Sequence, residues 1–506
     1  MQTITGTQLA STWAQPSREV RPKLEVRWNG VNWTDETAYL LSARVAGSLI
    51  REPLRLPMLG AVQPMVAEFV LLNQGRRFSP ENAGGDLYAY LQYGFRRIAI
   101  RFSMGIKNSL GAFEYLRQFT GFIDRAQPYT DASDQGPREM VQLACIDNTD
   151  LLQQAPLSTV LYENTRADLL LEDIITAAGI GDYTLATGRS VIPFAWLDSE
   201  KAWTECQLIA QADGGWCYCD KTGRFRFETL DQWLGVDTPV ATLSADRWWH
   251  LGQDEGWENA YTAVEVVYTP RAKRPIRTVY EAHEVFALQP GERREIVAEY
   301  DAPCAVVFEP TADADYQARG AGNRRMTEAL SLTMTAYAQR AIITMENTDS
   351  DHALYMVGLT LRGQPVEADE GYEERVDADA DVLATWWRGA DAKSKVWREM
   401  GNPYLQTRHQ ARRRAGVLRD RLQIPRKLLR LRASACPFLE YGDLVTVQHD
   451  MLDVEGLVLS ISVQWSVGGL YEGEYVILPN DGLYSEAPYF VIGESEYADP
   501  SEAVFW

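Results

Sequence analysis

The clearest hydrophobic pattern of the chain lies near its C-terminus, in residues 402–478. Alanine and leucine recur there at helical spacing, and Thr407 precedes Gln410 by three residues, as in a capping box. Pro425 marks the end of the predicted helix, because proline cannot continue one. Short apolar segments between glycine-containing turns follow the helix and predict strands at 429–433, 444–447, 457–463 and 475–478.

The N-terminal third also carries a strand pattern. Apolar residues alternate with polar ones or form short runs, and proline, glycine and asparagine separate the runs. Strands at such intervals are typical of a β-barrel or a β-sandwich. The predicted strands are 24–28, 38–45, 65–72, 97–104 and 115–124.

A compact α+β unit is predicted over residues 148–230, where the pattern changes. Thr165, with Asp168 three residues later, is the predicted start of a first helix. Ser199 is the predicted start of a second helix, which ends at a pair of glycines. A hairpin follows, in which Gly223 can adopt the positive φ that its turn requires.

Residues 271–400 are less regular, although strands are predicted at 336–345 and 355–361. The acidic stretch 365–381 is predicted to be an exposed loop. Residues 481–506 are acidic and aromatic, and we expect them to form an extended arm. No internal repeat of solenoid or propeller length is present in the sequence.

The composition is that of a globular protein: 506 residues, 46% hydrophobic and 24% charged, are enough for several domains. No apolar run approaches the ~18 residues that span a bilayer, and the N-terminus does not resemble a secretory signal, so we expect folding in a cytoplasm. The net charge of −21 argues against sequence-independent binding of nucleic acid. Negative charge on the wall of a channel would repel the phosphates of passing DNA, which is one interpretation of this net charge. The other is that the charge only keeps the protein in solution.

No pattern predicts a catalytic centre or a cofactor site. The six cysteines are scattered, and Cys217 and Cys219 lack the second pair that a zinc site needs, so we expect buried thiols. Glu281 and His283 would share a face in a strand and could bind a metal. An exposed strand or turn is the favoured interpretation of that segment.

Two further motifs fail in detail. Asp377, Asp379 and Asp381 begin like a calcium loop, but the glycine and glutamate that the loop needs later are missing, so a solvated acidic loop is favoured. The glycine-rich stretch 320–325 lacks the lysine and hydroxyl residue of a phosphate-binding loop.

A basic segment stands out in this acidic chain. Five arginines are predicted to surround the C-terminal helix away from its alanine and leucine face. They suggest either contact with nucleic acid or pairing with the acidic surface of a neighbouring subunit or domain. We favour the second, because the acidic segments supply such a surface. The candidate subunit-interface residues are Arg412, Arg413, Arg414, Arg419 and Arg421.

In their order, these segments resemble the tail hub proteins of tailed bacteriophages, found in siphophage tail tips and myophage baseplates. AYLLSARVAGSLIREPLRLPM and GFIDRAQPY resemble the first barrel of that family, and VQLACIDNTDLLQQ resembles its exit into an inserted domain. The helix at 165–179 and the helix and hairpin at 203–227 match that inserted domain. Residues 402–447 resemble the start of the second barrel.

The resemblance implies a homotrimer in which each subunit contributes two β-barrels to a ring. Such a hub adapts a six-fold tail tube to a three-fold tip and surrounds the channel for the tape-measure protein and for DNA in transit. The implied partners are a tail tube or distal tail ring protein and tip fibre or receptor-binding proteins. The implied location is the tail tip of the virion, assembled in the cytoplasm of a host bacterium. Because no partner domain for a contractile tail is visible in the sequence, we expect a long flexible siphophage tail, although the sequence does not decide between the two tail types. No catalytic residue and no cofactor is implied.

The predicted fold is mainly β with α+β insertions. We expect a first β-barrel in 1–147, with 231–248 as a candidate for its completion, and an inserted two-helix α+β domain in 148–230. A second barrel is expected in 249–285 together with 402–480, an additional β-rich domain in 286–401, and a C-terminal arm in 481–506.

Two other functions remain open. One is a tail-associated hydrolase of cell wall or polysaccharide, for which the tryptophans and acidic residues of 271–400 are candidates. The other is an adhesin in which the same region binds a host-surface glycan.

Overall fold

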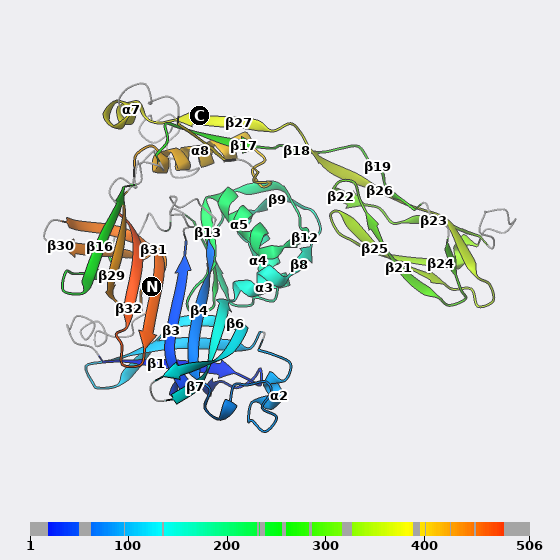
Figure 1. Ribbon diagram of the computed structural model, residues 1–506. Helices are drawn as coiled ribbons and strands as arrows, with labels where there is room; N and C mark the ends of the chain where they lie inside the picture. The colour runs from blue at the N-terminus through cyan, green and yellow to red at the C-terminus, as the bar shows by residue number, and fades with distance from the viewer. Residues whose placement is uncertain are drawn as a thin grey trace.

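The computed structural model describes most of the chain, which is mainly β, as predicted (Figure 1). The described residues are 19–49, 62–95, 97–133, 136–229, 232, 238–255, 260–282, 286–315, 326–387, 395–399, 401–425, 427–449 and 452–479. Within these ranges, no helix is both long and apolar enough to cross a lipid bilayer.

A thirteen-stranded sheet takes its strands from both ends of the chain. The N-terminal strands are β1 (Val20–Arg27), β2 (Thr34–Asp35), β3 (Leu40–Ser48), β4 (Gln63–Leu72), β5 (Ala99–Lys107), β6 (Phe113–Ser133) and β7 (Gly136–Asp147). The later strands are β15 (Ala241–Leu243), β16 (Trp248–Glu255), β29 (Lys427–Ser434), β30 (Leu444–His449), β31 (Leu452–Ser466) and β32 (Glu472–Pro479). Their order is β16-β29-β32-β31-β3-β4-β7-β6-β5-β1-β2, with β30 beside β31 and β15 beside β30. Short helical turns, η1 (Thr37–Tyr39), η2 (Gln74–Arg76) and α2 (Tyr88–Leu91), connect the N-terminal strands.

Strand β31 joins the two sets of strands. Its first half pairs with β30, and its second half pairs with β3, from Ser466 opposite Ser42 to Ser460 opposite Ser48. Two barrels were expected. Instead, these thirteen strands form one continuous sheet, and no closed barrel is found among the described strands. The pairing satisfies backbone groups that would otherwise lie on two exposed sheet edges. Strand β15, from the segment 231–248, pairs with β30 and not with an N-terminal strand.

Residues 149–229 form an α+β unit that shares a single hydrophobic core with the sheet. Its helices are α3 (Thr149–Gln154), α4 (Ala167–Ala177) and α5 (Ala202–Asp213). Its strands are β8 (Pro156–Ser158), β9 (Tyr162–Arg166), β10 (Tyr183–Leu185), β11 (Val191–Ala195), β12 (Asp198–Lys201), β13 (Gly215–Cys219) and β14 (Phe225–Thr229).

Both predicted helices of this unit exist, but they begin later than expected. Thr165 pairs within β9 opposite Ile192, and Asp168 accepts hydrogen bonds from the Arg166 side chain, so neither residue caps α4. Ser199 lies in β12, and α5 begins three residues after it. Strand pairing therefore competes successfully with the capping signals. The hairpin prediction is confirmed: β13 pairs with β14, and Gly223 has φ +89°.

The region between β16 and β29 contains three more sheets. A first, of order β27-β17-β28, comprises β17 (Ala263–Tyr268), β27 (Tyr372–Asp377) and β28 (Val396–Glu399). The second comprises β18 (Arg271–Lys273), β19 (Arg277–Glu281), β20 (Phe286–Leu288), β22 (Cys304–Val307), β23 (Thr311–Asp315) and β26 (Leu354–Ala368). The third comprises β21 (Arg293–Glu299), β24 (Leu330–Ala336) and β25 (Arg340–Asn347). The remaining helices are η4 (Thr327–Ala329), α7 (Ala380–Trp386) and α8 (Arg408–Leu422).

Residues 271–368, here called the arm, extend away from the rest of the molecule (Figure 1). The arm has a separate core, drawn from both of its sheets and including Leu288, Ile343 and Leu359. Its base touches the α+β unit, where Trp196 donates to the side chain of Gln339 (2.8 Å). The strands predicted in this region are confirmed as β25 and β26, with shifted ends.

The acidic stretch 365–381 is not the loop that its charge suggested. It forms the end of β26, all of β27 and the start of α7. Strand β27 is an edge strand that pairs with the apolar β17, so its acidic side chains can face solvent while its backbone is hydrogen-bonded. Glu373 and Asp377 are exposed, as expected for that stretch.

Helix α8 is confirmed with its capping box, in which Thr407 and Gln410 satisfy each other's backbone donors. The expected placement of its arginines is wrong for two of them, because Arg414 and Arg421 are buried. Arg414 lies three residues after Ala411 and so shares its buried face. The guanidinium is tolerated there because both carboxylate oxygens of Glu399 accept from Arg414 Nε at 3.1 Å.

This buried pair generates a stability prediction. We expect Arg414→Met or Glu399→Met alone to lower the free energy of unfolding by about 3–5 kcal/mol, because each leaves an uncompensated buried charge. The double variant should recover most of that loss. Urea denaturation measures all three. The exposed pair Arg224 and Asp182 is the matched control, and Arg224→Met should cost less than about 1 kcal/mol. Single variants as stable as the native chain would contradict the argument.

Candidate functional site: a basic groove beside the α+β unit

The arginines of α8 hold partners within their own chain. Arg413 donates to the backbone carbonyl of Asp213 (2.8 Å), which lies at the end of α5. Arg419 donates to Asp379 (2.7 Å), at the start of α7. The guanidinium of Arg421 lies over the ring of Trp216, with 5.6 Å between its carbon and the ring centroid. These contacts tie α8 to the α+β unit and to α7.

Contact of these arginines with another subunit stays a prediction. Arg414 has only 2% of its side chain exposed and has no surface to offer. Arg412 and Arg413 are partly exposed, and so is Arg419. The interface prediction therefore concerns these three residues and not the whole set.

The metal candidates of the sequence do not come together. In the described part of the chain, no group of three or more histidine, cysteine or acidic side chains is placed to hold a metal ion. Asp377 pairs with Arg375, and Asp379 pairs with Arg419. His283 and the glycine-rich stretch 320–325 lie outside the described residues.

The six cysteines are free and buried, as predicted. Burial raises the pKa of the Cys206 thiol well above its usual value, and the same cause acts on Cys219. A thiol with a raised pKa is a poor nucleophile and a poor metal ligand at neutral pH. These side chains serve packing.

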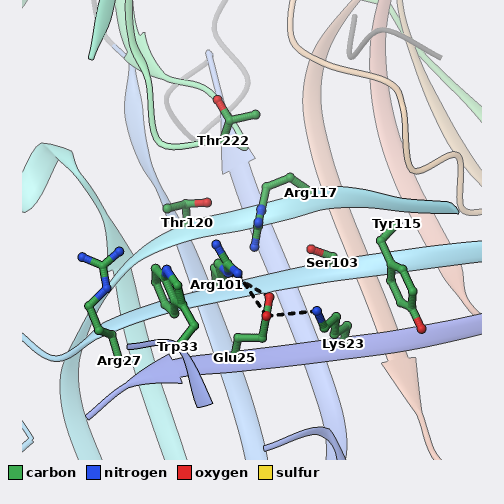
Figure 2. Close-up of a pocket in the computed structure, with 10 residues that line it drawn as sticks. All are labelled: Lys23, Glu25, Arg27, Trp33, Arg101, Ser103, Tyr115, Arg117, Thr120 and Thr222. Carbon is green, nitrogen blue, oxygen red and sulfur yellow. Dashed lines mark hydrogen bonds and ion pairs between the residues drawn. The ribbon is translucent and has the colours of Figure 1, made fainter. Parts of the chain in front are cut away.

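A groove of about 550 Å³ lies on the face of β1, β5 and β6, beside the turn of the β13–β14 hairpin (Figure 2). Four of its side chains are cationic, and one is a carboxylate. Its lining residues are Lys23, Glu25, Arg27, Trp33, Arg101, Ser103, Tyr115, Arg117, Thr120 and Thr222.

Strand register explains how these residues meet. One row crosses the three strands from Lys23 through Ser103 to Arg117. The next row crosses from Glu25 through Arg101 to Thr120. Because side chains alternate between the two faces of a strand, alternate residues of β1 all point into the groove.

A β-bulge at Gln118 determines which side chains of β6 face the groove. The register of β6 against β5 shifts by one residue there, so that Gln118 and Phe119 both point inward and are fully buried. Arg117 and Thr120, on either side of them, therefore both face the groove (Figure 2). Without the extra residue, one of the two would turn into the core.

The charges in the groove are unevenly matched. Glu25 accepts from Arg101 at 2.8 and 3.0 Å and lies 3.0 Å from the Lys23 ammonium. Although burial by itself raises the pKa of Glu25, these hydrogen bonds hold it below its usual value. Burial, together with the like charge of Arg101, lowers the pKa of Arg117 to about 10. Among the lining residues, four cations thus accompany one carboxylate.

Trp33 lies between two of the arginines (Figure 2). The guanidinium carbons of Arg27 and Arg101 lie 4.4 and 4.2 Å from centroids of its ring. Such cation–π contacts hold each guanidinium in place at the groove. The site is thus an ordered set of donors suited to an anion, and it contains no nucleophile paired with a base.

The floor of the groove rests on a buried lysine. Lys221, in the turn of the β13–β14 hairpin, is 2% exposed. Its ammonium donates to the side-chain oxygen of Gln118 (3.1 Å) and to the carbonyl of Pro437 (3.3 Å). Tyr471 donates to the same Gln118 oxygen (3.0 Å). Burial lowers the pKa of Lys221 to about 8, although the charge of Glu440 acts against it.

The groove was missed in the sequence, although part of its signal was present. Glu25 and Arg27 alternate within the predicted strand 24–28, and Lys23 directly precedes it at the same spacing, which indicates one charged face. Their meeting with Arg101 and Arg117 depends on non-local pairing and on a bulge. Neither has a local sequence signature.

A comparison with protein-family models finds no match, and a comparison with curated protein sequences finds none either. Solved structures do resemble this chain. One is the 43 kDa tail protein of prophage MuSo2 from Shewanella oneidensis, with 11% identity, a TM-score of 0.48, and coverage of 91% of this chain and 98% of that one. Another is a tail protein from Neisseria meningitidis MC58, with 9% identity, a TM-score of 0.47, and coverage of 91% and 98%.

A third is an E. coli component of the type VI secretion system, described as similar in structure to tail proteins of bacteriophage T4. It has 10% identity and a TM-score of 0.40, with coverage of 92% of this chain and 77% of that one. These structures are of the class that the sequence resemblance names. With such identities and with TM-scores below 0.5, they carry no function over to this chain.

Lys221 generates a prediction about pH. Its pKa of about 8 in the folded chain lies below the ~10.4 of an unfolded lysine, so the unfolded state binds more protons between these values. Stability contributed by this residue therefore rises with pH in that window. We expect the difference in unfolding free energy between the native chain and Lys221→Met to grow by up to about 1.4 kcal/mol per pH unit above pH 8.

Urea denaturation from pH 7 to 10 measures this difference, and below pH 8 it should stay constant. Lys107→Met, at an exposed lysine, is the control for effects unrelated to burial. A difference that is flat over the whole range would contradict the buried, partly deprotonated ammonium.

Proposed function

We propose that this chain is a structural protein of a bacteriophage virion, the hub at the distal end of the tail. The observation that carries the proposal is the continuous sheet. Strands from both ends of the chain pair through β3 and β31, with the α+β unit and the arm inserted between them. That is the order of parts that the resemblance to tail hub proteins implies.

In the proposed hub, three copies form a ring around a channel. The N-terminal strands, within 1–147, and the later strands, within 249–285 and 402–480, are the two barrel equivalents of one subunit. Three copies then present six of them to a six-fold tail tube and a three-fold surface to the tip. The α+β domain at 148–230 is the insertion of the first barrel equivalent, and 286–401 is that of the second.

The proposed partners follow from this position. They are a tail tube or distal tail ring protein above, tip fibre or receptor-binding proteins below, and the tape-measure protein and DNA within the channel. The role is structural and not enzymatic. The net charge of −21 supports it, since an acidic wall does not retain phosphate.

The arm supports a second candidate function, that of an adhesin for a host-surface glycan. It has its own core and lies away from the sheet, so it can carry binding without altering the hub. Its two ends are adjacent, because Asp369 donates a backbone hydrogen bond to Pro270 (2.8 Å).

The hub proposal predicts the mass and the symmetry of the particle. Native mass spectrometry should give about three times the 57.1 kDa of one chain. Negative-stain images along the axis should show a three-fold ring with a central opening, and purified virions should contain the protein. A monomer that is absent from virions would refute the proposal.

Removal of the arm separates the two candidate functions. We expect a chain that lacks 271–368, with Pro270 joined to Asp369 by a short glycine linker, to form the same trimer, because the main core contains no arm residue. Phage with this chain should assemble tails. Loss of host adsorption would assign binding to the arm, whereas unchanged adsorption would exclude the adhesin. Failure to form the trimer would contradict the independence of the arm.

A further inference from the structure

Four cationic side chains and a single carboxylate are among the lining residues of the basic groove, in a protein that is otherwise strongly acidic. Glu25 is its one carboxylate, and Arg101 and Lys23 already share it. Arg27 retains a buried Nε without a hydrogen-bond partner among the described residues. Like charges held this close favour the binding of an anion.

The shape of the groove matches an extended peptide that carries carboxylates. Residues two apart on a strand are separated by about 6.6 Å, and neighbouring strands by about 4.8 Å. Arg117, Arg101 and Arg27 lie on one diagonal of that lattice, where each step of one strand and two residues is about 8 Å. An extended segment with acidic residues at alternate positions presents its carboxylates about 6.6 Å apart, close to that step.

Nucleic acid fits the groove less well. Single-stranded nucleic acid is held by a basic track combined with aromatic rings on which bases stack. Trp33 already packs against Arg27 and Arg101, so its ring is not open to a base. The charge around the groove is that of a chain with net −21, which disfavours a long phosphate backbone.

The chain itself contains a segment with the required chemistry. Residues 481–506 lie outside the described residues, directly after β32. They contain no lysine, arginine or histidine. Their acidic residues are Asp481, Glu486, Glu494, Glu496, Asp499 and Glu502, two of which are spaced by two positions. In an extended conformation, the carboxylates of Glu494 and Glu496 would lie about one such step apart.

The segment is also long enough. Six strand spacings separate β32 from β5 in the sheet, which is about 29 Å at 4.8 Å per strand. Twenty-six extended residues reach about 85 Å. We propose that the groove formed by Lys23, Arg27, Arg101 and Arg117 is the binding site of the acidic C-terminal segment 481–506 of this chain.

Carbodiimide crosslinking of the full-length protein tests this proposal, because it joins an amine to a carboxylate in direct contact. Lys23 supplies the amine, and peptide mass spectrometry identifies its partners. We expect two products: the Lys23–Glu25 crosslink of the known ion pair, and a crosslink from Lys23 to a carboxylate in 481–506. The first product reports that the groove is intact in every variant.

Matched variants make the result specific. Arg27→Gln and Arg117→Gln should each reduce the crosslink to 481–506 at least about fivefold, as expected when one charge-assisted hydrogen bond is lost. Arg125→Gln, at an exposed arginine of the same strand as Arg117, should leave it unchanged. The double change E494Q and E496Q should also abolish or weaken it.

Three outcomes would overturn the proposal. The first is a Lys23 crosslink to Glu25 alone, and the second is equal yields in Arg117→Gln and Arg125→Gln. The third is loss of the crosslink to 481–506 on addition of a 12-nucleotide single-stranded DNA that binds the native chain but not Arg117→Gln. That result would assign the groove to nucleic acid.

Discussion

The buried ammonium of Lys221 is the contact on which the other parts of the structure depend. It joins the turn of the β13–β14 hairpin, the bulge of β6 and the segment before β30, three regions that are far apart in sequence. A charge in this position is stable only while all its acceptors are present. The contact therefore specifies one arrangement of the α+β unit against both sets of strands. Packing of apolar surfaces alone would tolerate several.

The same contact shapes the outer surface. Gln118 can reach Lys221 only because the bulge turns it inward, and that bulge is also what presents Arg117 and Thr120 to the groove. Thr120 in turn donates to the carbonyl of Lys221 (3.1 Å), so the hairpin turn and the groove wall are one unit. Gly223 allows this approach, since a Cβ there would lie 2.9 Å from Thr120. The bulge of β6 thus positions both the acceptor of the buried Lys221 ammonium and the Arg117 side chain at the surface.

Local patterns predicted the local structure well. The capping box of α8, the hairpin at Gly223 and the strand content follow from short-range signals, and the structure contains all three. The joining of the two strand sets could not be predicted, because β3 and β31 are about 400 residues apart and their pairing has no sequence mark. The buried arginine of α8 was misplaced for a related reason. A charged side chain is expected to be exposed, and only the fold shows that Glu399 is buried beside Arg414 and pairs with it.

The continuous sheet restricts how a hub of this kind could change shape. Strand β31 belongs to both halves, so the two barrel equivalents cannot move apart without breaking the seven residue pairs between it and β3. The arm is less restricted, because its core is separate and only contacts at its base, such as that between Trp196 and Gln339, hold it to the α+β unit. In the proposed trimer, opening of a channel would therefore occur between subunits or through the arms. The sheet and the α+β unit of each subunit would move together, because they share one core.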